Sequence, residues 1–186
     1  QDGKIRLEEY RMDFDKDDRW TSFSVAKSLV STLVGAAIKD GFIKSIDDPL
    51  TDYISELKGS GYDGVSVKQL LTMTSGVKWN EDYADAKSDV ALFNNTKPVG
   101  GVDPVIVYMK TLTNEAEPGT RWQYNTGETN LIGVLVAKAT GKTISEYLSE
   151  KVWAPYGMSQ DGEWLLNEGG KEIGGCCISA TVRDYA

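Results

Sequence analysis

The sequence predicts a mixed α/β (α+β) fold in which helices predominate and only a little of a sheet is visible. The first observation is a long apolar segment over residues 24–39, closed by Gly41, which is typical of a buried helix. The second is a series of further helical patterns along the middle of the chain. The third is a single strand-like alternation in residues 4–8. Because one strand cannot form a sheet, we expect this chain to be part of a larger fold.

The predicted elements follow one another in a simple order. Residues 4–8 alternate apolar and polar side chains, and the acidic residues 15–18 form the turn after this strand. The apolar helix begins at about Ser24 and is apolar almost all round, so we expect it to be buried. Four later segments are predicted as helices: residues 66–74, 103–112, 126–140 and 143–153. We expect Ser179 to begin a last helix.

Local signals delimit these helices. Gly76 and Gly141 each follow a helical segment at the position where a left-handed residue ends a helix. Thr143 and Glu146 have the Ser/Thr-x-x-Glu spacing of a capping box, which marks a helix start. These signals favour separate helices joined by long connections.

Charge and length narrow the possible partners. The chain has 186 residues, with 20 lysines and arginines against 28 aspartates and glutamates, and a formal net charge of −8. The length suffices for one domain with a real core. The negative charge argues against nucleic acid or an anionic membrane as partner, and no run is apolar enough to predict a transmembrane segment. The oligomeric state stays open.

Residues that usually hold metal ions are scarce. The chain has no histidine, and its two cysteines, Cys176 and Cys177, are adjacent. Because a disulfide between neighbours closes a strained ring, we expect two small buried thiols and no zinc site. The acidic residues 13–18 lack the glycine and the distal glutamate of an EF-hand, which favours a solvated turn over a calcium loop. We therefore expect neither a metal nor an organic cofactor.

Ser24 and Lys27 carry the strongest chemical signal. They lie at positions i and i+3 of the apolar helix, so their side chains share one face. A serine hydroxyl is a weak nucleophile unless a neighbour takes its proton, and without histidine a Ser-His-Asp triad within this chain is excluded. Lysine is the natural substitute, provided that its environment allows it to lose its own proton. The pattern predicts an acyl-transfer enzyme with a Ser/Lys pair.

The Ser-x-x-Lys spacing is weak evidence without its context. It occurs three times, at the pairs Ser24/Lys27, Ser55/Lys58 and Ser75/Lys78. At ordinary serine and lysine frequencies, about one match is expected by chance in a chain of this size. Only Ser24 opens a long apolar helix, where the helix dipole and free N–H groups favour an alkoxide. The alternative is that Ser24 is a helix cap and Lys27 a solvated residue.

A set of motifs in fixed order resembles a known family. The set comprises Ser24-Val-Ala-Lys27, Gly41, Asp48-Pro49, Leu70-Leu-Thr-Met-Thr-Ser-Gly76, Pro118-Gly-Thr-Arg-Trp-Gln-Tyr124, Gly133, Thr140-Gly141, Pro155-Tyr-Gly-Met158 and Gly174-Gly175. It is similar to the serine β-lactamase-related hydrolases. These include class C β-lactamases, D-alanyl-D-alanine carboxypeptidases, family VIII esterases and 6-aminohexanoate-oligomer hydrolases. The resemblance covers nearly the whole chain and implies a β-lactamase and penicillin-binding transpeptidase-like fold.

The resemblance also implies roles for individual residues. Ser24 would be the acylated nucleophile, Lys27 would exchange its proton, and Tyr124 would stand at the tyrosine of the family's Tyr-x-Asn motif. Asn125 and Thr126 complete that stretch and are the expected substrate-binding residues. Threonine replaces the family's asparagine at Thr126, which favours esters and linear amides over β-lactams. The alternative for Tyr124 is a buried aromatic residue at a helix entry.

One family motif is missing from this sequence. The Lys/His-x-Gly strand that supplies part of the oxyanion pocket is not found, and family members are about twice as long. We therefore expect an internal fragment, a partial β-lactamase-like domain over residues 1–186 that is inactive or weakly active alone. Its parts are the strand and turn (1–20), the nucleophile helix (21–40), the helical lobe (41–160) and the return toward the sheet (161–186). A periplasmic or secreted and a cytoplasmic location both stay open.

The resulting prediction is a serine hydrolase that forms an acyl-enzyme on small esters or linear amides, as in an esterase or a 6-aminohexanoate-oligomer hydrolase. One alternative is a β-lactam-binding sensor or D,D-peptidase-type domain that is acylated without efficient turnover. The other is a catalytically silent scaffold. Burst acylation without turnover would favour the sensor, and an unreactive Ser24 would favour the scaffold.

Overall fold

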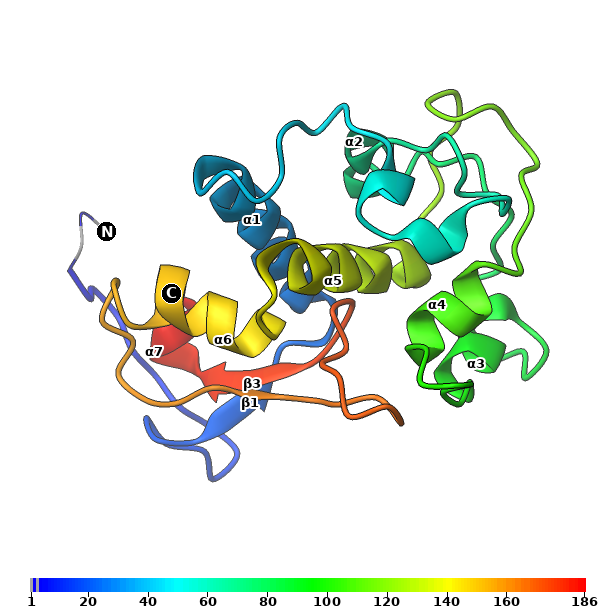
Figure 1. Cartoon of the computed structure of the whole chain (residues 1–186). Coiled ribbons are helices and arrows are strands. Elements are labelled where there is room, and N and C mark those ends of the chain that lie inside the picture. Colours follow the sequence, from blue (N-terminus) through cyan, green and yellow to red (C-terminus); the bar gives the residue numbers. More distant parts are fainter. Residues whose placement is uncertain (1, 3) are drawn as a thin grey trace.

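The computed structural model describes residue 2 and residues 4–186. A small sheet lies along one side of the molecule, with helices α1, α5 and α6 above it and a lobe containing α2, α3 and α4 beyond (Figure 1). The helices are α1 (Ala26–Lys39), α2 (Val67–Leu71), α3 (Asp89–Asn94), α4 (Pro104–Met109), α5 (Thr126–Thr140), α6 (Ile144–Leu148) and α7 (Val182–Tyr185). Shorter turns are the 3₁₀ segments η1 (Phe23–Val25), η2 (Leu50–Asp52) and η3 (Ser55–Leu57) and the π-helical segment η4 (Ser149–Trp153).

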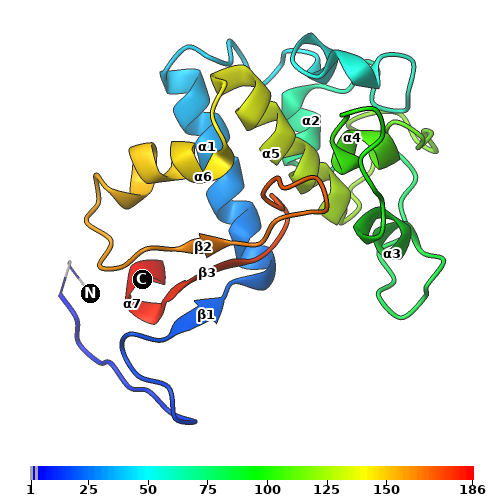
Figure 2. The same cartoon turned by 60° about the horizontal axis from the view of Figure 1, so that its bottom comes forward.

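The sheet is antiparallel and has its C-terminal strand in the centre. Strands β1 (Arg19–Thr21) and β2 (Glu163–Trp164) both pair with β3 (Ile178–Thr181), as Figure 2 shows. Trp20 faces Ala180 across one pairing, and Trp164 faces Ile178 across the other. The two ends of the described chain thus build one sheet.

Two predictions about strands and helices are wrong. Residues 4–8 form no strand, because Ile5 and Leu7 are 64% and 79% exposed and have no sheet to pack against. Residues 179–181 belong to β3 and not to a helix, since α7 begins only at Val182. Thr181 caps α7 by accepting a hydrogen bond from the Asp184 N–H. The polar residues that we interpreted as a helix start therefore mark the point where β3 ends and α7 begins.

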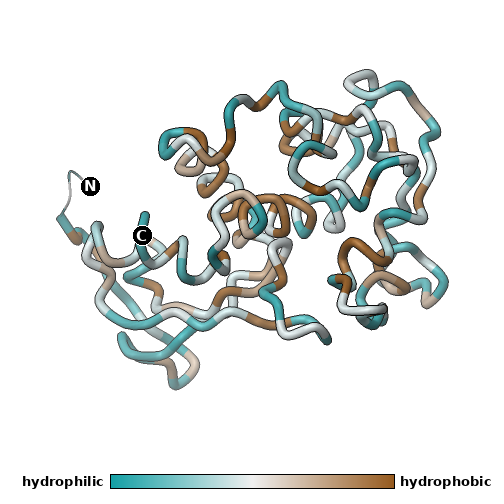
Figure 3. Tube along the Cα trace, viewed as in Figure 1, coloured by the Kyte–Doolittle hydropathy of each residue, from teal (hydrophilic) through white to brown (hydrophobic). Residues whose placement is uncertain are grey.

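The core forms where α1 packs against α5. Helix α1 buries one face, through Ala26, Val30, Leu33, Val34 and Ala37. The opposite positions Ser28, Thr32 and Gly35 are exposed, so the helix is not buried all round as we expected. Helix α5 is buried along most of its length, and both helices are predominantly hydrophobic where they meet (Figure 3). This packing fixes the N-terminal end of α1 beside the start of α5.

Most helix predictions are confirmed with shorter bounds. Helix α5 has the predicted limits and ends at Gly141, whose φ of +71° is left-handed. Helices α2 and α4 occupy the predicted segments, and the capping box of Thr143 and Glu146 opens α6. Helix α3 was not predicted, because six residues capped by Ser88 give too short a pattern.

Two loops hold each other in the helical lobe. The N–H of Gly119 donates to the carbonyl of Thr74 (2.7 Å), and the N–H of Gln123 donates to the carbonyl of Met73 (3.0 Å). Gly76 has a φ of +76°, and a side chain there would collide with the carbonyl of Ala116. The loop after α2 therefore supports the segment that leads into α5.

Candidate active site

Ser24 and Lys27 meet at the start of α1. Lys27 Nζ lies 3.0 Å from Ser24 Oγ and donates to it. The same nitrogen donates to the backbone carbonyl of Gly175 at 2.6 Å. Ser24 is exposed, whereas Lys27 is half-buried. The lysine is therefore held between the serine oxygen and a carbonyl from the far end of the chain.

The turn before α1 places Ser24 against the sheet. The N–H of Ser22 donates to the carbonyl of Ile178 (2.7 Å), and the N–H of Ile178 donates to Ser22 Oγ (3.0 Å), which continues the β1–β3 pairing. The chain then turns through Phe23, which has a φ of +45°. A positive φ is strained for a phenylalanine, and such strain concentrates at functional sites. The backbone thus presents Ser24 beside the start of β3.

Tyr124 completes the set of three predicted catalytic residues. Lys27 Nζ lies 5.3 Å from the centre of the Tyr124 ring, which is within cation–π distance. Tyr124 is half-buried and stands two residues before α5 begins. Ser24, Lys27 and Tyr124 are therefore neighbours, although about 100 residues separate the tyrosine from the serine.

The Gly174-Gly175 motif allows the C-terminal segment to approach α5 closely. A Cβ at Gly174 would lie 2.9 Å from the carbonyl oxygen of Thr129, and the Cβ of any residue replacing Gly133 would lie 3.3 Å from Gly174 Cα. A Cβ at Gly175 would lie 2.7 Å from Asn130 Nδ2. Side chains at these positions would push the segment away from α5 and away from Lys27. The glycines are thus needed to bring the Gly175 carbonyl to the lysine.

Asn125 and Thr126 face different surroundings. Asn125 is 2% exposed, and its Oδ1 accepts the N–H of Glu128 (3.0 Å), which caps α5. Its side chain faces the interior, and this placement does not support the substrate contact expected from the sequence. The N–H of Thr126 donates to Glu81 Oε2 at 3.0 Å, and its hydroxyl donates to Glu81 Oε1.

Glu81 gathers donors from two segments beside Tyr124. Tyr83 Oη donates to Glu81 Oε1 at 2.7 Å and lies 3.3 Å from Thr126 Oγ1, while the Trp79 indole donates to Glu81 Oε2. The side chain of Tyr83 is 68% exposed. The position compared with the asparagine of the Tyr-x-Asn motif thus holds a hydroxyl bound by a carboxylate and flanked by an exposed phenol.

Most of the sequence matches one protein family. Residues 1–164 match the sequence profile of the family described as Beta-lactamase. The chain belongs to the Beta-lactamase family. Homologues of this family are serine hydrolases, and the small antiparallel sheet with its helices is the β-lactamase and transpeptidase-like fold.

Similar proteins include enzymes with different substrates. The chain is 35% identical over 190 residues to the 6-aminohexanoate-dimer hydrolase of Paenarthrobacter ureafaciens, covering 99% of this chain and 48% of that protein. It is 25% identical over 138 residues to a β-lactamase of Pseudomonas fluorescens, covering 73% and 34%. The solved penicillin-binding protein from Bacillus halodurans superposes with a TM-score of 0.72 at 19% identity, covering 92% and 59%. The chain spans about half the length, or less, of these curated relatives.

The other two Ser-x-x-Lys pairs of this Beta-lactamase family chain have different surroundings. Ser55 Oγ contacts Glu56 Oε2 at 3.5 Å, and both residues are exposed. Ser75 is 2% exposed and donates to Glu128 Oε1. In the described part of the chain, neither serine has a hydrogen bond to its lysine. Ser24 is therefore the only one of the three that the structure joins to a lysine.

Sequence patterns did not reveal four residues of the site: Glu81, Tyr83, Glu128 and Gly175. Glu81 and Tyr83 lie in a polar loop without a motif, and Glu128 is one of many acidic residues in the sequence. Gly175 belongs to the Gly174-Gly175 motif of the family resemblance, but no role in the site was predicted for it. The usable signal for Glu128 was an acidic residue in a helix with only one other charged residue, Lys138.

The cysteine pair differs from the prediction. Cys176 and Cys177 are joined by a disulfide and are half-buried, so the expectation of two buried thiols is wrong. The φ of Cys177 is +81°, which is outside the extended conformation that points neighbouring side chains to opposite faces.

Within the described residues, no three metal-ligating side chains gather, and no helix has the length and apolar character of a membrane span.

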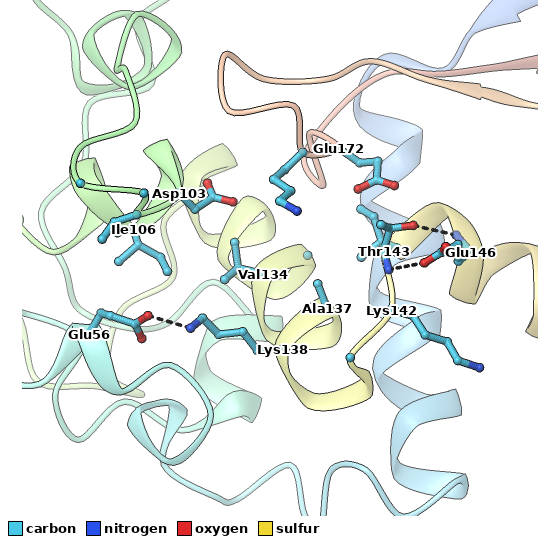
Figure 4. A pocket seen from close by; sticks show the side chains of 17 residues that line it. Glu56, Asp103, Ile106, Val134, Ala137, Lys138, Lys142, Thr143, Glu146 and Glu172 are labelled. Atoms are coloured by element: carbon cyan, nitrogen blue, oxygen red, sulfur yellow. Dashed lines mark hydrogen bonds and ion pairs between the residues drawn. The ribbon is translucent and has the colours of Figure 1, made fainter.

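A cavity of about 550 Å³ lies along the C-terminal half of α5 (Figure 4). One wall carries the ion pair of Lys138 and Glu56 (2.7 Å), and another carries the capped start of α6 at Thr143 and Glu146. Ser24, Lys27 and Tyr124 do not line it. The cavity is therefore separate from the candidate catalytic residues.

Proposed function

We propose that this protein is a serine hydrolase that forms an acyl-enzyme at Ser24 and acts on small esters or linear amides. The observation that carries the proposal is the placement of Lys27 Nζ, 3.0 Å from Ser24 Oγ and 2.6 Å from the carbonyl of Gly175. In a chain without histidine, this lysine is a base within hydrogen-bond distance of a serine at a helix start. Membership of a family of serine hydrolases supports the same assignment.

Each residue has a defined step in the proposed reaction. Lys27, in its neutral form, takes the proton of Ser24 while Oγ bonds to the substrate carbonyl carbon. The N–H of Ser24, at the positive end of α1, donates to the oxyanion that forms. The bond from carbon to the leaving oxygen or nitrogen then breaks, and the leaving group takes the proton through Tyr124. Water repeats these steps on the ester of Ser24 and releases the acid.

The surroundings of Thr126 support the substrate class. In place of an asparagine amide, this position offers a hydroxyl that Glu81 already binds, with Tyr83 beside it. An amide that would donate to a β-lactam is therefore missing. The 35% identical relative is named for hydrolysis of a 6-aminohexanoate dimer, which is a linear amide.

The test is covalent labelling of the full-length protein. We expect a fluorophosphonate to add one phosphonyl group to the wild type, and Ser24→Ala to abolish the addition in the intact-mass spectrum. Ser55→Ala, which changes an exposed serine with the same spacing to a lysine, is the matched control and should be labelled like the wild type. Labelling that persists in Ser24→Ala would contradict the proposal.

Turnover separates the proposal from its rivals. We expect steady release of p-nitrophenol from a p-nitrophenyl ester after the first equivalent. A burst of one equivalent without further release would identify the sensor or D,D-peptidase-type alternative instead. No acylation of the folded wild type would identify the silent scaffold.

A further inference from the structure

Glu128 is a buried acid in the first turn of α5, next to the segment that carries Tyr124. Its side chain is 1% exposed. Ser75 Oγ donates to its Oε1 atom, and Asn125 Nδ2 lies 3.4 Å from the same atom. Ser75 is itself held by the N–H of Val77, which donates to its hydroxyl at 3.0 Å. The carboxyl group therefore connects the loop after α2 to the first turn of α5.

The hydrogen bonds of this carboxyl group are asymmetric. Both donors converge on Oε1, and in the described part of the chain Oε2 has no partner. The buried hydroxyl of Tyr62 faces Asn125 and Glu128 and, within the described residues, also has no hydrogen-bond partner. One oxygen that accepts twice and one that accepts nothing is the pattern of a carboxylic acid, whose hydroxyl needs an acceptor. The Tyr62 oxygen can supply that acceptor.

Burial favours the same protonation state. Removal of Glu128 from water raises its pKa to about 8, although Ser75 and Tyr62 lower it by donating hydrogen bonds to the ionised form. The pKa of Tyr62 is also raised well above its usual value, first by burial and then by Glu128. Two charged groups lie around this pair: Arg121 lines the same small void as Glu128 but donates to Glu115, and Asp89 acts on Tyr62. On the other side of the α5 start, Glu81 binds Thr126.

The link to the site runs through Asn125. Its Oδ1 accepts the N–H of Glu128 at 3.0 Å, and its Nδ2 faces the Glu128 carboxyl group. Both halves of the amide are therefore oriented by one residue. Because Asn125 stands between Tyr124 and Thr126, its orientation fixes the backbone on which Tyr124 faces Lys27.

We propose that Glu128 is a positioning residue that works as a neutral carboxylic acid, holding Asn125 and through it Tyr124 in place for acylation of Ser24. This inference rests on the proposed function. Ionisation would leave a bare, buried carboxylate oxygen that must draw in a new donor. The Asn125 amide and the Tyr62 hydroxyl already interact with the carboxyl group, and Arg121 lines the same void. Ionisation therefore redirects these donors, displaces the Tyr124 segment and slows acylation.

The experiment compares pH profiles of three full-length proteins. Glu128→Gln keeps the size and the Oε1 acceptor but cannot ionise. Glu146→Gln is the matched control, since Glu146 occupies the same third helical position in α6 but is exposed and lies by the separate cavity (Figure 4). The readout is the rate of fluorophosphonate labelling between pH 6 and pH 10.

The expected difference lies on the alkaline side. At pH 7 the labelling rate of Glu128→Gln should be within about threefold of the wild type. At pH 9 about nine tenths of Glu128 would be ionised in the wild type. When each labelling rate is divided by the highest rate of the same protein, the rate of Glu128→Gln should exceed that of the wild type by about tenfold. Glu146→Gln should follow the wild-type profile. A Glu128→Gln profile that superposes on the wild type, or a folded variant slowed equally at every pH, would overturn the inference.

A second measurement covers a variant that does not fold. Carbon-13 NMR of the wild-type carboxyl groups should show one glutamate signal that titrates at about pH 8. This signal should be absent from the spectra of the Glu128→Asp variant. Only ordinary glutamate titrations below pH 6 would overturn the inference. Either failure would leave labelling at Ser24 intact, whereas loss of labelling specificity at Ser24 would count against the proposed function itself.

Discussion

Gly175→Ala tests whether the carbonyl of residue 175 holds Lys27. The new Cβ would lie 2.7 Å from Asn130 Nδ2 and 3.0 Å from two atoms of Thr126, whereas ordinary contact begins at 3.4 Å. The segment must therefore move by about 0.7 Å. Lys27 Nζ now lies 2.6 Å from the carbonyl, and N–H···O bonds extend to about 3.2 Å. A shift of this size along the bond either breaks it or forces the two atoms into collision.

The expected loss follows from the energy of that hydrogen bond. Removing one partner of a hydrogen bond that is shielded from water costs about 1–3 kcal/mol, which corresponds to roughly a 5- to 150-fold change in rate. We expect kcat/KM for a p-nitrophenyl ester to fall by that factor in the full-length protein, while urea unfolding shows a loss of only about 1–3 kcal/mol.

Gly141→Ala is the control for a simple loss of stability. Gly141 has a φ of +71° at the end of α5, and a Cβ there would meet nothing within 4 Å. The substitution should lower stability by about 1 kcal/mol and leave kcat/KM unchanged. If Gly175→Ala keeps kcat/KM within threefold of the wild type, or loses no more than Gly141→Ala, the assigned role of the Gly175 carbonyl is refuted.

Three further outcomes are expected. Lys27→Ala and Tyr124→Phe should each lower ester turnover by at least about 100-fold. Lys27→Arg should be inactive too, because a guanidinium does not give up its proton, and an active arginine variant would disprove proton transfer by Lys27. Esters or linear amides should be cleaved far faster than nitrocefin because Thr126 replaces the asparagine, and comparable initial rates would contradict this. The raised pKa of Glu128 means that the folded protein binds its proton more tightly than the unfolded chain, so stability declines as pH rises from about 4.5 to about 8. Urea titrations of Glu128→Gln should lack this component, worth up to roughly 5 kcal/mol, and identical pH slopes in both proteins would argue against a buried neutral acid.

Local interactions explain what the sequence alone could predict of the fold. Helix α5 was predicted with its observed limits, because its apolar period and its Gly141 stop lie within the segment itself. Strand β3 was missed, because four residues acquire strand geometry only by pairing with β1 and β2, which lie far away in the sequence.

The candidate site divides in the same way. The contact between Ser24 and Lys27 follows from helical spacing, and the structure places the pair at 3.0 Å. Glu81 reaches Thr126 across 45 residues, and no spacing rule connects a polar loop to a helix start. The Tyr-x-Asn comparison located Thr126 but not the carboxylate that binds it.

The anchor of Lys27 makes reactivity a late product of folding. Serine and lysine are neighbours on one helical turn, but the carbonyl that holds the lysine comes from a segment 148 residues away. Contacts across such distances form slowly, because closing a long loop costs chain entropy. A polypeptide that has formed α1 but not yet docked the segment before β3 carries both side chains without their anchor. Under the proposed function, Ser24 therefore becomes reactive only when folding is complete. The fraction of labelled serine then measures the fraction of fully folded protein during refolding.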